Sequence, residues 1–213
     1  MGGMVQRGRR TAKVSGDERQ DTILITAEAL LAERAFDDIS IEELARGAGI
    51  SRPTFYFYFG SKDEVLLALL DRVITEVEHR VGDLPRDFES DPAAAWTRSI
   101  GMFVEVFAAH RGVSTAAIAA RARNEEVRAL WSKSMQSWVD FSSDVIRSEQ
   151  ARGAAPEGVD AHDLAVSLNL MNERVITAVL DAESPAIAET SALHVLSTIW
   201  IRSIYGSDNP GRR

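Results

Sequence analysis

Residues 44–62, with the sequence LARGAGISRPTFYFYFGSK, constrain the fold more than any other stretch of the chain. Two glycines, Gly47 and Gly49, interrupt an otherwise helical pattern, and an unbroken run of five aromatic residues follows at positions 55–59. Such a run on a protein surface is unfavourable in water, so it needs either a core to bury it or a partner to cover it. The segment therefore predicts a compact unit with a specific binding face.

Helix-capping signals set the boundaries around this segment. Ser40 and Glu43 have the spacing of a capping box, in which each side chain satisfies a free backbone N–H group at a helix start. Ser51 is a suitable cap for the next helix, and Pro53 falls in its first turn, where a missing N–H group costs little. The Ser-x-x-Glu spacing recurs at residues 61–64. Three helices are predicted, with a glycine turn between the first two.

A helix, a short glycine turn and a short helix form the helix-turn-helix pattern, whose second helix lies in the DNA major groove. An ordinary helical hairpin with all its aromatics in the core has the same spacing, so spacing alone leaves both interpretations open. Charge favours DNA binding, because Arg46, Arg52 and Lys62 are the charged residues of the segment and none is acidic.

The aromatic and polar residues of the second helix are expected to divide between core and DNA. Phe55 and Phe59 are predicted to point inward. Arg52 and Thr54 can reach base edges, whereas tyrosine and lysine side chains are suited to holding phosphates. The alternative for Tyr58 is a place in the helix core. The residues predicted to bind DNA are Arg46, Ser51, Arg52, Thr54, Tyr56, Tyr58 and Lys62.

The net charge of −8 argues against indiscriminate nucleic-acid binding. Basic residues nevertheless gather near the start of the chain, at Arg7, Arg9, Arg10 and Lys13. We predict that residues 1–16 are a flexible basic arm, either a simple tail or an arm whose arginines reach phosphates or a minor groove.

Several classes of protein are excluded by composition. The chain has no cysteine, which rules out disulfides, and its four histidines are scattered, so neither a metal nor a cofactor is predicted. No Ser–His–acid arrangement, pair of carboxylates or phosphate loop suggests catalysis, and no catalytic residue is assigned. No apolar run is long enough to span a membrane and no signal peptide opens the chain, so a cytoplasmic, nucleoid-associated protein is expected.

Helical periodicity continues to the end of the chain, and period-two alternation is not found. The prediction is an all-α fold with a DNA-binding domain at residues 17–80, including a connecting helix, and a larger domain at residues 81–213. Gly82 and two prolines mark the linker between them. A short helix is expected within residues 111–123, and Ser184 with Pro185 is expected to start the last helix.

Large aromatic side chains recur on the faces of the C-terminal helices. Their ordinary role is core packing, but flat aromatic rings also line ligand sites preferentially. Asn169 and Asn172 lie on a helix that is otherwise apolar, and a buried amide left without partners costs about 1–3 kcal/mol. A ligand cavity and a hydrogen bond across a helix interface both explain these asparagines.

The segment GISRPTFYFYFGSKDEVLLALL resembles the signature of the TetR family of transcriptional regulators. Resemblance to one member continues through RGRRTAKVSGDERQ, LWSKSMQSWV, RGAAPEGVDAHDLAVSLNLMNER and SIYG. The resemblance implies a TetR-like fold, with a three-helix head followed by a ligand-binding and dimerisation domain. It also implies a repressor that binds operator DNA as a homodimer, answers to an apolar effector and controls a neighbouring monooxygenase gene. An activator of this family and a carrier that has lost DNA binding are the alternatives.

In the similar family member an elongated, mostly apolar channel runs through the C-terminal domain, with an asparagine at its polar end. Two positions depart from its pattern, since Phe141 stands where a tyrosine is expected and Thr177 where a phenylalanine is expected. The preferred ligand is therefore expected to differ. By position, the residues implied to line the channel here are Phe103, Phe107, Trp131, Met135, Trp138, Phe141, Asn169, Asn172 and Trp200.

The last two helices are expected to form the homodimer contact as a four-helix bundle. Their small and apolar residues would let two helix pairs approach closely. The residues that suggest this contact are Ala165, Val166, Ala178, Ala182 and Ala192.

Overall fold

The computed structural model describes residues 16–83 and 88–207, and within these ranges the chain is helical with no strand. The predicted all-α fold is confirmed. The helices in chain order are α1 (Gly16–Leu31), the 3-10 turn η1 (Phe36–Asp38), α2 (Ile41–Gly47), α3 (Arg52–Phe55), α4 (Lys62–Gly82), α5 (Pro92–Ala109), α6 (Arg111–Ala120), α7 (Glu125–Ala151), α8 (Ala161–Leu180) and α9 (Glu189–Tyr205). None of the helices in these ranges is long and apolar enough to cross a bilayer. The predicted basic arm lies outside the described residues.

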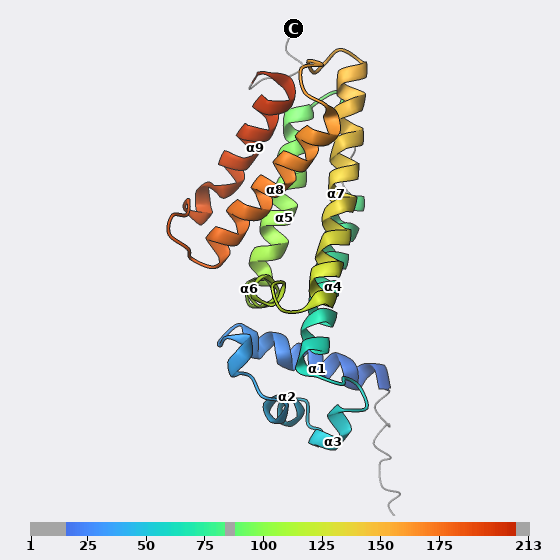
Figure 1. Ribbon diagram of the computed structural model, residues 1–213, viewed down its shortest axis with the longest axis vertical. Coiled ribbons are helices and arrows are strands. Elements are labelled where there is room, and N and C mark those ends of the chain that lie inside the picture. The colour runs from blue at the N-terminus through green and yellow to red at the C-terminus, as the bar shows by residue number, and fades with distance from the viewer. Residues whose placement is uncertain (1–15, 84–87, 208–213) are drawn as a thin grey trace, which may run out of the picture.

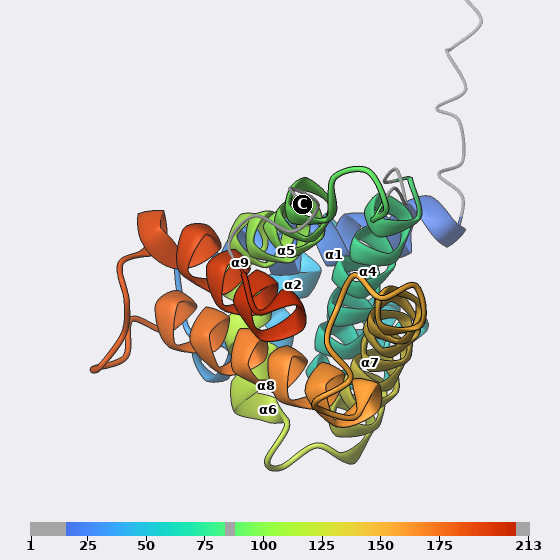
Figure 2. The same cartoon turned by 90° about the horizontal axis from the view of Figure 1, so that it is seen from above.

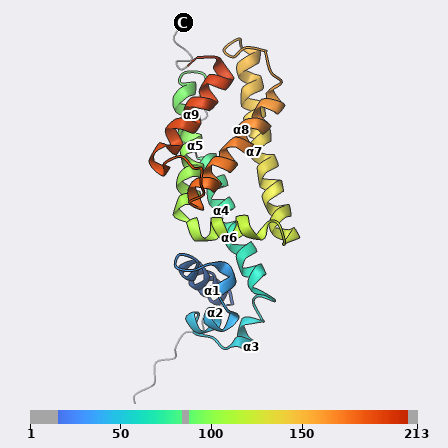
Figure 3. The ribbon, with the colours of Figure 1, turned by 60° about the vertical axis from the view of Figure 1, so that its left-hand side comes forward.

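The helices form a small head and a larger body joined by α4. Helices α1 to α3 lie at one end of the molecule, and α4 runs from them into the body (Figure 1). Helix α6 lies crosswise between the head and the long helices of the body (Figure 3). Viewed from above, α8 and α9 form one side of the body, whereas α4 and α7 form another (Figure 2). Because α4 belongs to both parts, a shift of this helix would be felt in both.

The aromatic run is anchored as predicted at both of its ends. Phe55 is completely buried and Phe59 is 4% exposed, within a hydrophobic core that also contains Ile23 and Leu66. Helix α3 ends at Phe55, and backbone N–H groups of residues 57–59 donate to carbonyls three or four residues earlier, so a tight turn follows the helix. The two buried rings therefore fix the position of the turn between them.

Local capping agrees with the sequence at two helix starts and differs at the third. The Ser40–Glu43 capping box is present, and the Ser51 hydroxyl accepts a hydrogen bond from the backbone N–H group of residue 54. At the start of α4 the Ser61 hydroxyl caps the helix, but the Glu64 carboxylate accepts from Gly60 N–H at 2.8 Å instead of completing a box. Glu64 therefore fixes the turn before α4.

Two expectations for the last helices are wrong. Helix α9 begins at Glu189, four residues after Pro185, because the intervening residues follow an extended loop. Ala165, Ala178 and Ala192 are buried within the chain, where small side chains let its own helices pack closely. Those three alanines are therefore not available to a partner subunit.

The junction between α5 and α6 joins the body to the head. A methyl group added at Gly112 would lie 2.3 Å from the carbonyl oxygen of Leu31, so α6 meets the end of α1 where only glycine fits. One residue before α6, the two ring nitrogens of His110 face carboxylates from the other two helices, Glu28 on α1 and Glu76 on α4. The Nε2–Glu76 distance is 3.1 Å. His110 thus links three helices.

This linkage predicts a pH-dependent stability. Partial burial of His110 disfavours its cation, but the hydrogen bonds with Glu28 and Glu76 outweigh burial and raise its pKa above the ordinary value of 6.5. A raised pKa in the folded state stabilises the protein fully below the unfolded-state pKa, and this contribution is lost as pH rises through the folded-state pKa. We expect the loss of unfolding free energy in His110→Gln to be larger near pH 6 than near pH 9, as measured by chemical denaturation. A loss independent of pH would contradict this linkage.

Candidate nucleic-acid interface and ligand cavity

The predicted DNA-binding residues gather on α2, α3 and the turns that follow each of them. Arg46, Ser51 and Arg52 are exposed, Thr54 and Tyr58 are partly buried, and Tyr56 is 46% exposed. Tyr58 packs against the hydrophobic core and borders a groove with Leu67 and Leu130, which agrees with the alternative predicted for it, a place in the helix core. Lys62, the first residue of α4, is also oriented differently from the others.

Arg52 is held in place by two neighbours on its own surface. Its guanidinium donates to Glu42 at 3.1 Å and to the Tyr56 hydroxyl at 3.4 Å. The hydrogen bond with Tyr56 and the nearby Glu42 carboxylate raise the pKa of Arg52, so its charge is permanent. An exposed ion pair of this kind contributes little to stability, so a guanine or phosphate can replace Glu42 at low cost.

Ser51 and Thr54 form the polar start of α3. Their hydroxyl oxygens are 2.8 Å apart, and Ser51 also accepts from the Thr54 N–H group at 3.2 Å. The hydroxyl of Thr54 is therefore oriented before any ligand binds. Arg46, at the end of α2, has no ion pair with any residue in the described ranges, so its charge remains available to a phosphate.

The expectation that Lys62 holds a phosphate is wrong for the structure as it stands. Its ammonium nitrogen lies 3.0, 3.2 and 3.1 Å from the carbonyl oxygens of Phe36, Asp37 and Ile39. It also lies over the Phe36 ring, 4.7 Å from the ring centre. An ammonium group has three donors, and all three are used here. Lys62 therefore fastens the turn before α2 to the start of α4.

Phe57 is a surface residue that the sequence pattern did not single out. Its side chain is 86% exposed, more than that of either neighbouring tyrosine. Helical spacing could have identified it, because a residue two places from each of two buried phenylalanines lies on the opposite side of the helix.

A cavity of about 290 Å³ lies in the body between α4, α5, α6, α7, α8 and α9. All nine residues expected to line a channel border it, including Phe141, and so does Thr177, the other departure from the family pattern. Its aromatic walls pack edge to face, with the rings of Phe103 and Trp138 5.0 Å apart and those of Trp131 and Trp138 5.8 Å apart. Edge-to-face packing leaves gaps that aliphatic side chains would fill, which favours an apolar cavity.

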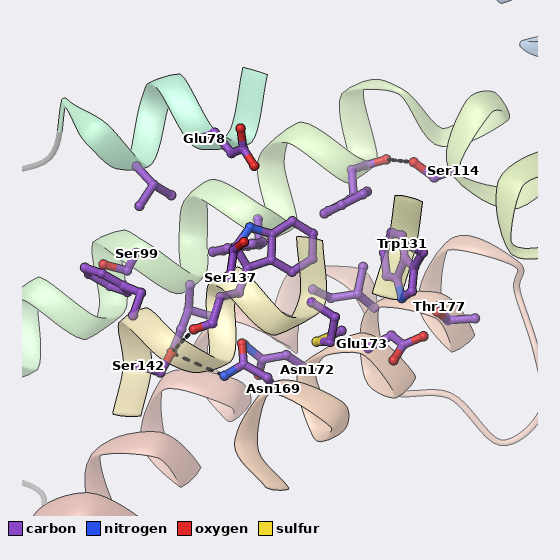
Figure 4. A pocket seen from close by; sticks show the side chains of 18 of the residues that line it. Glu78, Ser99, Ser114, Trp131, Ser137, Ser142, Asn169, Asn172, Glu173 and Thr177 are labelled. Carbon is purple, nitrogen blue, oxygen red and sulfur yellow. Dashed lines mark hydrogen bonds between the residues drawn. The ribbon is translucent and has the colours of Figure 1, made fainter. Parts of the chain in front are cut away.

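Asn169 and Asn172 give one wall a polar character, and both point towards the cavity from α8 (Figure 4). The Asn172 side-chain oxygen accepts a hydrogen bond from Trp200 Nε1 at 2.8 Å, and its amide nitrogen has no hydrogen-bond partner within residues 16–83 and 88–207. Asn169 donates to Ser142 and to the Ala165 carbonyl, which leaves its own oxygen over. The wall therefore offers one donor and one acceptor.

Two buried indole groups border the same cavity without a hydrogen-bond partner in the described part of the chain, Trp131 Nε1 and Trp138 Nε1. Buried donors without an acceptor are rare in folded proteins, because each loses its hydrogen bonds to water. The aromatic cluster is thus less well satisfied than an ordinary core.

The connecting helix forms part of the cavity wall, which the sequence did not reveal. Leu70, Glu78, Val81 and Gly82 of α4 border the cavity, and Glu78 lies across from the two asparagines (Figure 4). The opposite end of α4 starts directly after the aromatic run. One helix therefore contacts both the cavity and the predicted DNA-binding surface.

Both parts of the chain match described protein families. Residues 23–69 match the family described as bacterial regulatory proteins of the tetR family. Residues 96–206 match the family described as the C-terminal domain of the transcriptional regulator EthR. A regulator from Saccharomonospora viridis, solved in complex with choline, has the same fold, with a TM-score of 0.73 at 22% identity over 87% of this chain and 96% of that one.

The chain belongs to the TetR family of bacterial helix-turn-helix transcriptional regulators. It is similar throughout to the HTH-type transcriptional regulator EthR of Mycobacterium tuberculosis, with 49% identity over 95% of this chain and 94% of that one. EthR of Mycolicibacterium smegmatis is 44% identical over 94% of this chain and 93% of its own length. The predicted family membership is confirmed.

The position of Lys62 predicts a role in stability. Lys62→Met keeps the apolar stem and removes the charge that three carbonyl oxygens share. We expect the free energy of unfolding to fall by about 1–3 kcal/mol in a denaturant titration. The control Arg46→Ala changes an exposed residue and should alter stability by less than about 0.5 kcal/mol. Equal stability of the two variants would refute this role.

The cavity predicts binding of a small apolar molecule. N-phenyl-1-naphthylamine, an uncharged dye that fluoresces in apolar surroundings, should bind the wild type. Thr177→Phe fills part of the cavity and should weaken dye binding about tenfold, which corresponds to about 1.4 kcal/mol. The control Thr190→Phe makes the same exchange at an exposed position on α9 and should bind like the wild type. Unchanged binding by Thr177→Phe would place the dye elsewhere.

Proposed function

We propose that this protein is a repressor that binds operator DNA as a homodimer and is released when an apolar small molecule enters the cavity. The observation that carries the proposal is the dual position of α4, which begins beside the DNA-binding helix and ends in the cavity wall. A ligand that pushes on Val81 or Glu78 acts on the same helix that positions the head. Repression and release then follow from one rigid element.

The energetic requirement on the ligand is specific. A ligand changes the balance between DNA-bound and released forms only through a difference in its affinity for the two. In this proposal the released form has the larger cavity, with α4 displaced away from the aromatic cluster. The unpaired indole donors and the leftover amide groups favour an occupant that is mostly apolar and carries one polar group.

The homodimer is proposed to form through the outer faces of α8 and α9. Leu170 on α8 and Ile199 on α9 are 49% and 38% exposed, which is unusual for large apolar side chains. Buried alanines inside the α8–α9 pair hold the two helices close, so the pair can act as half of a four-helix bundle. A twofold dimer would place two recognition helices about one DNA turn, ~34 Å, or slightly more apart.

The similarity to EthR supports three further parts of the proposal. The regulated gene is proposed to be a neighbouring monooxygenase gene, the protein is proposed to work in the cytoplasm at the nucleoid, and the functional division is placed at residues 80 and 81. The preferred effector is proposed to differ from that of the relatives, because Phe141 removes a hydroxyl from one wall and Thr177 widens another.

Fluorescence anisotropy tests the DNA-binding part. Labelled duplexes that tile the region upstream of this gene and its divergent neighbour are titrated with protein at two salt concentrations. The wild type should bind one fragment far more tightly than scrambled DNA. Arg46→Ala should weaken binding. It should also lower the slope of log affinity against log salt concentration by about one, since it removes one phosphate contact. The control Arg98→Ala removes an exposed arginine of the body and should bind like the wild type.

The coupling is tested with the same fragment. A compound that displaces N-phenyl-1-naphthylamine from the cavity is added to the protein–DNA complex, and release of the DNA is expected. If no displacing compound alters operator affinity, the coupling through α4 is wrong. If no upstream fragment is preferred, DNA binding itself is in question, and a carrier function would account better for the cavity.

A further inference from the structure

The most exposed large hydrophobic side chain in the described part of the chain lies in the middle of the aromatic run. Phe57 is 86% exposed, compared with 64% for Ile25 and 54% for Val159. No ring contact joins Phe57 to another aromatic residue in the described ranges. A bare phenylalanine costs solubility, and a polar residue would fit the same position without strain, so folding of the monomer does not require it.

The direction of Phe57 follows from the residues around it. Phe57 lies in the turn after α3, which ends at Phe55. Phe55 and Phe59 are buried on either side of it, whereas Phe57 is exposed, so its ring points away from the core. Tyr56 is also exposed, and Tyr58 is partly buried. The apolar ring thus lies on the outer side of this turn.

The turn follows directly on the helix that a helix-turn-helix regulator places in the major groove. Tyr56, the neighbour of Phe57, lies 3.4 Å from the Arg52 guanidinium in the first turn of this helix. An outward-facing ring at the end of this helix can therefore reach the groove. The groove floor offers mostly polar base edges, and its one apolar group is the C5-methyl of thymine.

We propose that Phe57 reads thymine methyl groups in the operator and is a determinant of sequence specificity. Contact with a methyl group buries apolar surface on both partners, which is favourable, whereas the exposed edge of cytosine or guanine leaves polar groups facing a ring that cannot hydrogen-bond. Phe57 therefore favours thymine by attraction and disfavours G·C pairs by desolvation. This inference rests on the proposed operator binding.

Replacement of thymine by deoxyuridine tests the inference, because the two bases differ only in the C5-methyl group. Duplexes are first selected from a random pool with the wild-type protein, and the enriched sequence is then synthesised with thymine or with deoxyuridine throughout. The wild type should bind the deoxyuridine duplex roughly three- to fivefold more weakly for each methyl contacted. Phe57→Ala should bind the thymine duplex roughly tenfold more weakly than the wild type and should no longer distinguish the two duplexes.

Ile25→Ala is the matched control, since it removes an exposed apolar side chain from the head outside the recognition helix. It should keep the full deoxyuridine penalty of the wild type. Both variants alter exposed residues, so their thermal midpoints should equal that of the wild type, which separates loss of contact from loss of fold.

Two results would overturn the inference while leaving the proposed function intact. In the first, the wild type would bind the thymine and deoxyuridine duplexes equally. In the second, Phe57→Ala would weaken binding but keep the deoxyuridine penalty, and Phe57 would then be a sugar or phosphate contact. If selection enriches no sequence at all, operator binding fails and the inference fails with it.

Discussion

Helix α4 is packed along its whole length, and the arrangement of the other parts depends on this. Its first turns bury Val65 and Leu66 against the same core that holds the recognition helix, and its last turns border the cavity. The hydrophobic core of the head continues without interruption into the aromatic cluster of the body through Phe107 and Trp138. Close-packed interiors transmit displacement instead of absorbing it, which is the physical basis of the coupling proposed between cavity and head.

The polar contacts around α4 complete this connection. Lys62 ties its first residue to the turn before α2, and Glu76 ties its later part to His110 at the start of α6. Gly112 brings α6 against the end of α1 with no room for a side chain. Head and body are therefore joined by direct backbone and charge contacts on three helices, and the head cannot rotate without breaking some of them.

The two binding surfaces use opposite strategies. The DNA-binding surface is small, basic and exposed on an acidic protein, which limits non-specific attraction to nucleic acid and leaves recognition to a few oriented side chains. The cavity is mostly aromatic and apolar, and its polar lining includes Glu78, Ser142, Asn169, Asn172 and Glu173. Binding to a basic surface displaces counterions, whereas binding in an apolar cavity removes apolar area from water.

The sequence by itself determined the all-α fold, the helix starts at Ser40, Ser51 and Ser61, and the burial of Phe55 and Phe59, because capping and helical periodicity are local signals. It also determined the residues around the cavity, because the family pattern covers the whole chain. Only the tertiary structure decided the contacts of Lys62, the exposure of Phe57 and the part of α4 in the cavity wall. Lys62 is a basic residue in a basic segment, and nothing local distinguishes a phosphate from three carbonyl oxygens about 25 residues away. Which face of a helix meets a partner depends on what the remote chain covers, and that is fixed only when the helices pack.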